Sequence, residues 1–173
     1  YERLAKAYPE PYEAYVGTTL NNLGALNSKT QHFDKAEEYF LRALEIYERL
    51  ASQWPDVYAS NVQMVQEILR ILEEKQDEIR SLVEEYLLKA KTWMSTYSEA
   101  NRFEEACKCY EQAIALTRES LTDENLAERM LEYGKFLHDN NQYHKIEAYY
   151  QEALSIYECL ATTCLETHEA KIA

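Results

Sequence analysis

The chain has 173 residues, which is long enough for one sizeable core or for one array of helical repeats. Its 18 Lys and Arg against 31 Asp and Glu give a formal net charge of −13, and such a field repels nucleic acid phosphates and anionic lipid headgroups. This charge leads us to expect neither a nucleic acid nor a membrane partner. In addition, no apolar run is long enough to span a bilayer, and no signal peptide is visible.

The acidic excess deepens along the chain. The net charge is −2 over residues 1–55, −4 over residues 56–99 and −7 over residues 100–173. Electrostatics therefore favours a basic peptide or a basic domain as the partner. The alternative interpretation is that the charge serves solubility alone.

The chain opens on residues 1–8, which have the pattern of the end of a helix whose beginning lies outside this sequence. Pro9 and Pro11 would end that helix, because proline cannot donate to the helical hydrogen-bond ladder. We therefore expect the sequence to be a fragment that starts inside a preceding repeat.

Residues 13–53 have the pattern of a helical hairpin. At three- and four-residue spacing, one face of a first helix carries Leu20, Leu23, Gly24 and Leu26. After a polar break, the second helix carries an apolar stripe at Phe33, Ala36, Tyr39, Phe40, Ala43, Leu44, Tyr47 and Leu50. Because glycine inside a helix costs about 1 kcal/mol relative to alanine, we expect Gly24 to face Ala36 and Ala43 and to bring the helices close together.

Residues 56–98 form an irregular helical segment. Pro55 would stop the preceding helix, and Asp56 is a candidate N-cap for the next one. A first apolar stripe is followed by the polar run Glu73–Glu78 and then by a second stripe that begins at Ile79. We expect a turn at Glu74–Asp77. The alternative is one long helix over residues 57–98, which no Gly or Pro forbids.

Two weaker copies of the hairpin pattern follow. Within residues 87–121, the spacing of Phe33, Ala36, Phe40 and Ala43 recurs seventy residues later at Phe103, Ala106, Tyr110 and Ala113. Within residues 123–166, for which Asp123 is a candidate N-cap, the spacing of Gly24, Phe33, Phe40 and Ala43 recurs 110 residues later at Gly134, Tyr143, Tyr150 and Ala153. Recurrence at a period near forty residues is typical of a helical solenoid.

This pattern resembles the tetratricopeptide repeat family. The residues of the first hairpin that fit the family pattern are Leu20, Leu23, Gly24, Ala36, Phe40 and Ala43. The later copies depart from it, since Met94 replaces Gly and Ile146 replaces Ala. Glu48, Arg118 and Glu158 also stand where a closing Pro is expected, so the second helices can run another turn.

The string LNNLG and the long period are similar to the variety of about forty residues found in kinesin light chains. The resemblance implies an all-α fold, built as a right-handed superhelical stack of antiparallel helix hairpins. It also implies a single domain over residues 1–173.

The same resemblance implies that the first helix of each hairpin lines a concave groove for a peptide or protein. The implied groove-facing residues are Thr18, Asn21, Asn22, Ala25, Ser28, Lys91, Thr92, Ser95, Leu131, Lys135 and His138. Asn21 and Asn22 are the strongest candidates, because a side-chain amide donates to and accepts from a peptide backbone at once. The alternative is a merely polar, exposed face. Glu132 stands where a donor to a C-terminal carboxylate would be needed, which disfavours that ligand.

The sequence carries no recognised catalytic or metal-binding motif. The four histidines have no metal-ligand spacing, and there is no phosphate-binding loop or nucleophile elbow. Glutamate pairs that are adjacent in sequence diverge around a helix, which makes them solvated faces rather than acid–base pairs. We therefore expect no enzyme activity, no metal and no cofactor.

The cysteines and tyrosines fit the same interpretation. Cys107, Cys109, Cys159 and Cys164 form no CxxC pair, which predicts reduced structural thiols and a reducing, cytoplasmic compartment. Cys107 and Cys109 should point to different sides of one helix. Most of the fifteen tyrosines fall on the repeat phase, so we expect them to fill helix seams; the alternative is a tyrosine-lined binding surface.

The leading functional hypothesis is a non-enzymatic scaffold or adaptor that binds a peptide or protein, favoured to be basic, in the concave groove. One alternative is a structural or self-associating segment of a longer repeat array, which would form homo-oligomers. Another alternative is a sensor or regulatory domain of a larger multidomain protein.

Overall fold

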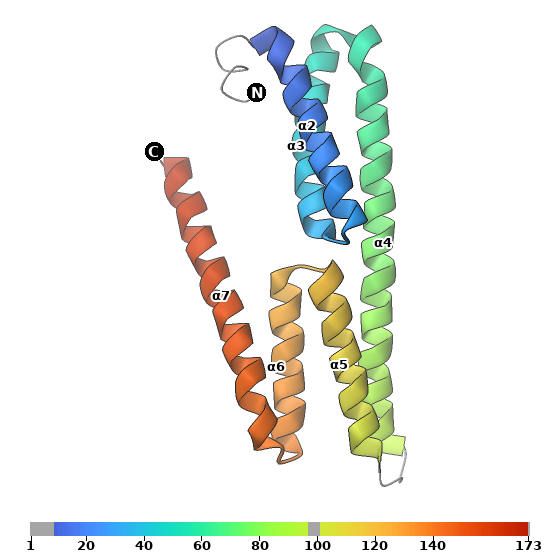
Figure 1. The fold of residues 1–173 in the computed structure, drawn as a ribbon, viewed down its shortest axis with the longest axis vertical. Helices are drawn as coiled ribbons and strands as arrows, with labels where there is room; N and C mark the ends of the chain where they lie inside the picture. The colour runs from blue at the N-terminus through green and yellow to red at the C-terminus, as the bar shows by residue number, and fades with distance from the viewer. Residues whose placement is uncertain (1–8, 97–100, 173) are drawn as a thin grey trace. The chain divides into compact units, whose positions relative to one another are not determined.

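The structure, a computed structural model, describes residues 9–96 and 101–172, and the side chains of residues 12–96 and 101–163. The described residues are almost entirely helical and contain no strand. The helices are α2 (Pro9–Lys29), α3 (Phe33–Gln53), α4 (Pro55–Thr96), α5 (Arg102–Ser120), α6 (Asp123–Asp139) and α7 (Tyr143–Ile172) (Figure 1). The all-α fold class is confirmed, whereas the helix end expected at residues 1–8 lies outside the described residues.

The chain divides into two compact units, residues 1–78 and residues 79–173, and α4 contributes to both. Each unit is described by itself below. A single domain over the whole chain and a right-handed superhelical path through it therefore stay predictions.

In the first unit, α2 and α3 form an antiparallel hairpin closed by a tight turn (Figure 1). Gln31 in that turn adopts a left-handed φ of 63°. Six members of the predicted stripe of α3 are buried, namely Phe33, Ala36, Phe40, Ala43, Tyr47 and Leu50, whereas Tyr39 and Leu44 are partly buried. The helix ends at Gln53, beyond Glu48, as expected in the absence of a closing proline.

Gly24 lies against the ring of Phe40, and the predicted approach of Gly24 to Ala36 and Ala43 stays a prediction. The three atoms nearest to a Cβ built on Gly24 all belong to the Phe40 ring, at 2.8–2.9 Å. Ala36 and Ala43 are fully buried. The small residue therefore does serve close packing, but it makes room for an aromatic ring.

The first half of α4 packs on this hairpin, and the turn expected at Glu74–Asp77 is wrong. Those residues are helical, and Gln76, within the polar run, is buried and donates from Nε2 to Glu37 Oε2 at 3.4 Å. The run consists mainly of strong helix formers and contains neither Gly nor Pro. Arg70 adds ion pairs to Glu67 and Glu74, one turn away on each side. Apart from Gln76, the polar run therefore forms the exposed surface of a continuous helix.

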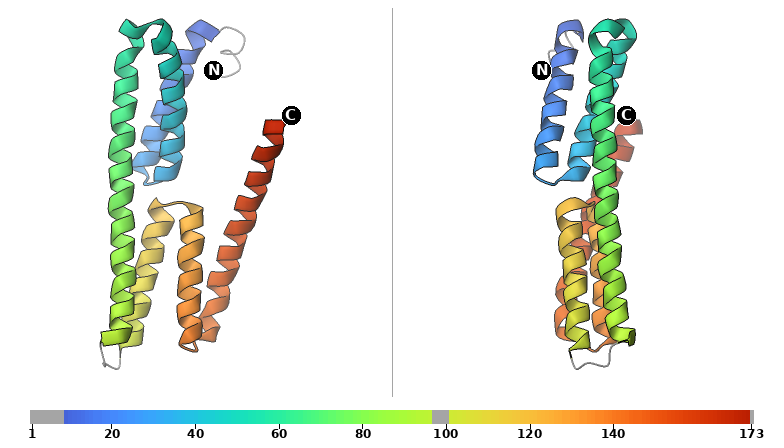
Figure 2. Two further views of the ribbon diagram at one scale, coloured as in Figure 1. Left: turned by 180° about the vertical axis from the view of Figure 1, so that it is seen from behind. Right: turned by 90° about the vertical axis from the view of Figure 1, so that its right-hand side faces the viewer.

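In the second unit, residues of α5, α6, α7 and the rest of α4 form one hydrophobic core, with α5 beside α4 and α7 beside α6 (Figure 2). Its core contains an aromatic cluster in which the Tyr110 ring lies 5.2 Å from that of Tyr133 and 4.7 Å from that of Phe136, between ring centroids. The α6–α7 hairpin closes through Asn141, which has a left-handed φ of 61°. The equivalent residue 110 positions earlier is Gln31, whose φ is similar. Beyond this turn α7 runs past the end of α6 (Figures 1 and 2).

Two predicted helix caps are corrected. The N-cap of α6 is Thr122 rather than Asp123, because the Thr122 hydroxyl accepts from Asn125 N at 3.3 Å. Helix α4 begins at Pro55, so Asp56 lies in its first turn and not at its N-cap. A proline at the first helical position loses no hydrogen bond, which explains how Pro55 both follows α3 and opens α4.

Candidate functional site

The residues predicted on the first helix do share one side of α2. Helical spacing places them within about a third of the helix circumference, and we call this surface the α2 face: Thr18, Asn21, Asn22, Ala25 and Ser28. Thr18 and Asn22 are exposed, and the other three are partly buried. The α2 face is therefore accessible along its length.

The two ends of the α2 face are held by neighbouring helices. The Thr18 hydroxyl donates to Ala14 O at 2.9 Å and lies 3.3 Å from the Tyr47 hydroxyl of α3. Ser28 lines a hollow of about 100 Å³ together with residues of α4, namely Ile68, Ile71, Leu72 and Lys75. These contacts fix the ends of the face and leave its centre to Asn21 and Asn22.

The two central asparagines differ in their surroundings. Asn22 is exposed, and no hydrogen bond or ion pair of its side chain is found in the part of the chain that the structure describes. The Oδ1 atom of Asn21 is buried without a hydrogen-bond donor among the described residues. A buried carbonyl oxygen without a donor costs about 1–3 kcal/mol, so Asn21 is a polar group that lacks its partner.

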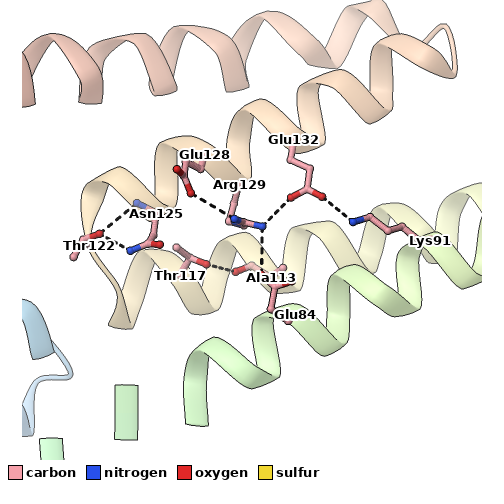
Figure 3. Close-up of polar contacts among 9 residues, drawn as sticks. All are labelled: Glu84, Lys91, Ala113, Thr117, Thr122, Asn125, Glu128, Arg129 and Glu132. Carbon is pink, nitrogen blue, oxygen red and sulfur yellow. Dashed lines mark hydrogen bonds and ion pairs between the residues drawn. The ribbon is translucent and has the colours of Figure 1, made fainter. Parts of the chain in front are cut away.

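The predicted residues on α4 are engaged within the second unit. Lys91 Nζ lies 3.3 Å from a carboxylate oxygen of Glu132 on α6 (Figure 3). The hydroxyls of Thr92 and Ser95 donate to carbonyl oxygens of their own helix, at Leu88 and Thr92. These three side chains are therefore less available to a ligand than the asparagines of α2.

Glu132 belongs to a wider ion-pair network that joins α6 to α4. The guanidinium of Arg129, only 21% exposed, lies 2.9 Å from Glu132, 3.5 Å from Glu128 and 3.6 Å from Glu84 (Figure 3). With Lys91, two cations face three carboxylates, so the network keeps an excess of negative charge. Its role is to join two helices, and it leaves an acidic surface on the second unit.

The predicted residues on α6 are exposed side chains. Leu131 is 41% exposed, Lys135 is exposed, and His138 lies 3.5 Å from Asp139. The His138 ring also meets the Tyr143 ring of α7 edge-on, with 5.5 Å between ring centroids. His138 therefore adjoins α7, and Leu131 is an exposed apolar side chain.

The sequence analysis missed an exposed aromatic stripe on α7. Its members are one or two turns apart on the same side of the helix, and we call this surface the α7 face: Tyr143, Tyr150, Leu154 and Tyr157. Tyrosines do fill seams elsewhere, since Tyr47, Tyr110 and Tyr133 are buried. On α7, by contrast, Tyr143, Tyr150 and Tyr157 are exposed, which leaves the alternative of a tyrosine-lined binding surface open.

Two of the four cysteines are buried, whereas Cys159 is exposed and the side chain of Cys164 lies outside the described residues. Cys107 and Cys109 are buried free thiols on opposite sides of α5: Cys107 is near Tyr133 of α6, and Cys109 is near Lys89 of α4. The prediction that they point to different sides is thus confirmed. Burial raises the pKa of both thiols, which lowers the fraction of reactive thiolate.

Two further observations bear on chemistry and location. The described residues contain no group of three or more His, Cys, Asp and Glu side chains placed to hold a metal ion. Within residues 9–96 and 101–172, no helix combines the length and the apolar character that crossing a membrane requires.

Comparison with known families agrees with the hairpin geometry. One sequence model of the tetratricopeptide repeat matches residues 2–49, and a second matches residues 95–124. No curated protein and no solved structure matches the chain significantly. The kinesin light chain variety stays an expectation.

The two matches fall on different parts of the structure. The first ends within the α2–α3 hairpin, and the second covers α5 with its flanking residues. Tetratricopeptide repeats generally mediate protein–protein interaction and are typically non-enzymatic. The chain therefore carries tetratricopeptide repeats, as the spacing of its glycines, alanines and aromatic residues indicated.

Proposed function

We propose that this protein is a non-enzymatic interaction scaffold that holds an extended peptide, or an extended segment of a partner protein, along the α2 face. The observation that carries the proposal is the exposed Asn22 amide, which has no partner in the described residues, at the centre of that face. Beside it, Asn21 keeps a buried oxygen without a donor.

The chemistry of the two amides suits a peptide backbone. A peptide offers one N–H and one C=O per residue, and an asparagine side chain complements both. A backbone N–H that approaches Asn21 would supply the donor that its Oδ1 lacks, which would compensate for turning the side chain outward. Recognition of this kind reads the backbone and depends little on the ligand's side chains.

Charge favours a basic ligand. The chain carries a net charge of −13, and a field of that sign accelerates association with a cationic partner at low ionic strength. We place the scaffold in a reducing compartment such as the cytoplasm, an assignment supported by the free thiols of Cys107, Cys109 and Cys159.

Peptides selected on the full chain from a random library test this function. Asn22→Ala should weaken the selected peptides by about tenfold, the effect of losing hydrogen bonds at an interface, and should leave the unfolding midpoint unchanged. The matched control is Thr19→Ala, an exposed polar residue of α2 outside the face. Selected peptides that tolerate changes at both Asn21 and Asn22 would contradict the proposal.

A further inference from the structure

The α7 face has a buried counterpart in the first unit. At an offset of 110 residues, its tyrosines correspond to residues of α3 that are 7%, 1% and 2% exposed: Phe33, Phe40 and Tyr47. The α7 tyrosines themselves are 58%, 39% and 36% exposed: Tyr143, Tyr150 and Tyr157. Two copies of one pattern thus differ in whether something covers them.

In the first unit, the first half of α4 lies on the α2–α3 hairpin, where Leu72 lines a hollow with Ser28 and Gln76 donates to Glu37. The contact of a helical glycine with an aromatic ring is common to both hairpins, at Gly24 with Phe40 and at Gly134 with Tyr150, so it does not explain the difference. What the first unit adds is a further helix, α4, whose buried residues Leu72 and Gln76 meet Ser28 and Glu37 of the α2–α3 hairpin. Among the described residues of the second unit, no helix takes that place on α6 and α7.

The side chains of α4 that face the first hairpin indicate which residues a helix docked on α7 would carry. Its buried or hollow-lining side chains, Val65, Ile68 and Leu72, follow helical spacing, and Gln76 one turn later donates to Glu37. The counterpart of Glu37 is Glu147, which is exposed and accepts from Gln151 of its own helix. A helix docked on α7 would therefore meet an apolar stripe and then a carboxylate.

Charge indicates which kind of helix would bind the α7 face. By helical spacing, Glu147 and Glu158 border the α7 face, whereas Lys145 lies on the opposite side of the helix. A second copy of the chain would bring another net charge of −13 to this surface. We propose that the α7 face docks an amphipathic helix of a partner protein whose apolar stripe is flanked by Lys or Arg.

This inference rests on the proposed role as an interaction scaffold, but it concerns a different surface from the α2 face. The probe is a labelled synthetic helix with the sequence of residues 57–78, in which Glu67, Glu73, Glu74, Asp77 and Glu78 are replaced by Lys. The unmodified sequence is the acidic comparator. Binding to the full chain is measured by fluorescence anisotropy at low and at physiological salt.

We expect the basic helix to bind at least about tenfold more tightly than the acidic one at low salt. Leu154→Asp, at a position 58% exposed, should weaken binding at least about tenfold, as should Tyr143→Ala. Ser155→Asp adds the same charge on another exposed side of α7 and should change binding less than about twofold. Circular dichroism checks that each variant is folded.

Other outcomes overturn the proposal. Equal weakening by Leu154→Asp and Ser155→Asp would mean that bulk charge alone binds the helix. Absence of binding, or binding insensitive to Leu154, would exclude the α7 face. Dimers of the chain that Leu154→Asp dissociates would make a second copy the occupant. Asn22→Ala should leave this binding unchanged, which separates a failure here from a failure of the α2 face.

Discussion

The α2–α3 hairpin and the α6–α7 hairpin place the same features at the same positions, 110 residues apart. Each has a helical glycine under an aromatic ring and a left-handed residue in its turn, at Gln31 and at Asn141. The ring is 1% exposed in Phe40 and 39% exposed in Tyr150. The pattern within a repeat thus sets how its two helices pack. Whether the aromatic residues of the second helix are buried depends on what else packs on the hairpin.

The largest test of this comparison removes the ring from each hairpin. Phe40→Ala should lower the free energy of unfolding of the first unit by about 3–5 kcal/mol, since it removes a buried ring and leaves a cavity in its place. Tyr150→Ala should cost the second unit about 1 kcal/mol, because much of that ring is already in water.

Urea unfolding followed by tryptophan fluorescence separates the two units. Trp54 reports the first unit in a Trp93→Phe background, and Trp93 reports the second in a Trp54→Phe background. Each background protein without the alanine change is the control. Similar losses from Phe40→Ala and Tyr150→Ala would show that the two rings are equally buried.

The stability of the second unit at alkaline pH tests how deeply its aromatic core is buried. Burial, with a smaller contribution from the charge of Glu132, raises the pKa of Tyr110 from 10 to about 12. A raised pKa means that the folded state keeps its proton, so this stability is complete below pH 10 and is lost as the pH rises toward 12. The loss should be about 1.4 kcal/mol per pH unit within that window.

The thiols of Cys107 and Cys109 shift in the same direction, so the decline should begin near pH 9, where the thiols of an unfolded chain ionise. Tyr110→Phe keeps the ring and removes the phenol, and it should reduce the slope between pH 10 and 12. Urea midpoints of the Trp93 reporter, measured at successive pH values, check this. An unchanged slope in Tyr110→Phe would refute the assignment.

The smallest test adds one methyl group to each hairpin. A Cβ at Gly24 would lie 2.8 Å from the buried Phe40 ring, which has no room to move, so Gly24→Ala should destabilise the first unit by about 1–2 kcal/mol. A Cβ at Gly134 would lie 2.2 Å from the edge of the Tyr150 ring, which is exposed and free to turn aside. The gain in helix propensity, about 1 kcal/mol, should then make Gly134→Ala close to neutral.

The same fluorescence reporters measure both glycine variants. Alanine at a helix position without a close ring, as in Ser155→Ala, provides the control for propensity. If Gly134→Ala proves as damaging as Gly24→Ala, the Tyr150 ring is held in place and the contrast between the hairpins fails.

What lies within one hairpin could be predicted from the sequence, because it depends on residues three or four positions apart. The apolar stripe of α3 and the opposed cysteines of α5 are of this kind. The predicted turn at Glu74–Asp77 failed for a physical reason: polarity separates loops from cores, but it does not separate loops from the outer surface of a long helix. Gln76 is buried where α4 meets α3, and its hydrogen-bond acceptor Glu37 lies 39 residues away in sequence.

The candidate site was predictable only in part. Helical spacing was enough to gather Asn21, Asn22 and their neighbours on one face of α2. It could not show that Lys91 is already paired with Glu132, because that pair joins two helices. The exposure of Tyr143 and Tyr150 was equally hidden, since their positions match buried residues of α3 and only the absence of a covering helix among the described residues distinguishes them.

Hydroxyl-radical footprinting read out by mass spectrometry tests the contrast between the hairpins most directly, because it reports the exposure of equivalent aromatic residues in one experiment on the intact protein. We predict that Tyr143, Tyr150 and Tyr157 are oxidised readily while Phe33, Phe40 and Tyr47 are protected. Equal protection of the two sets would contradict the account, because it would mean that the α7 face is already covered.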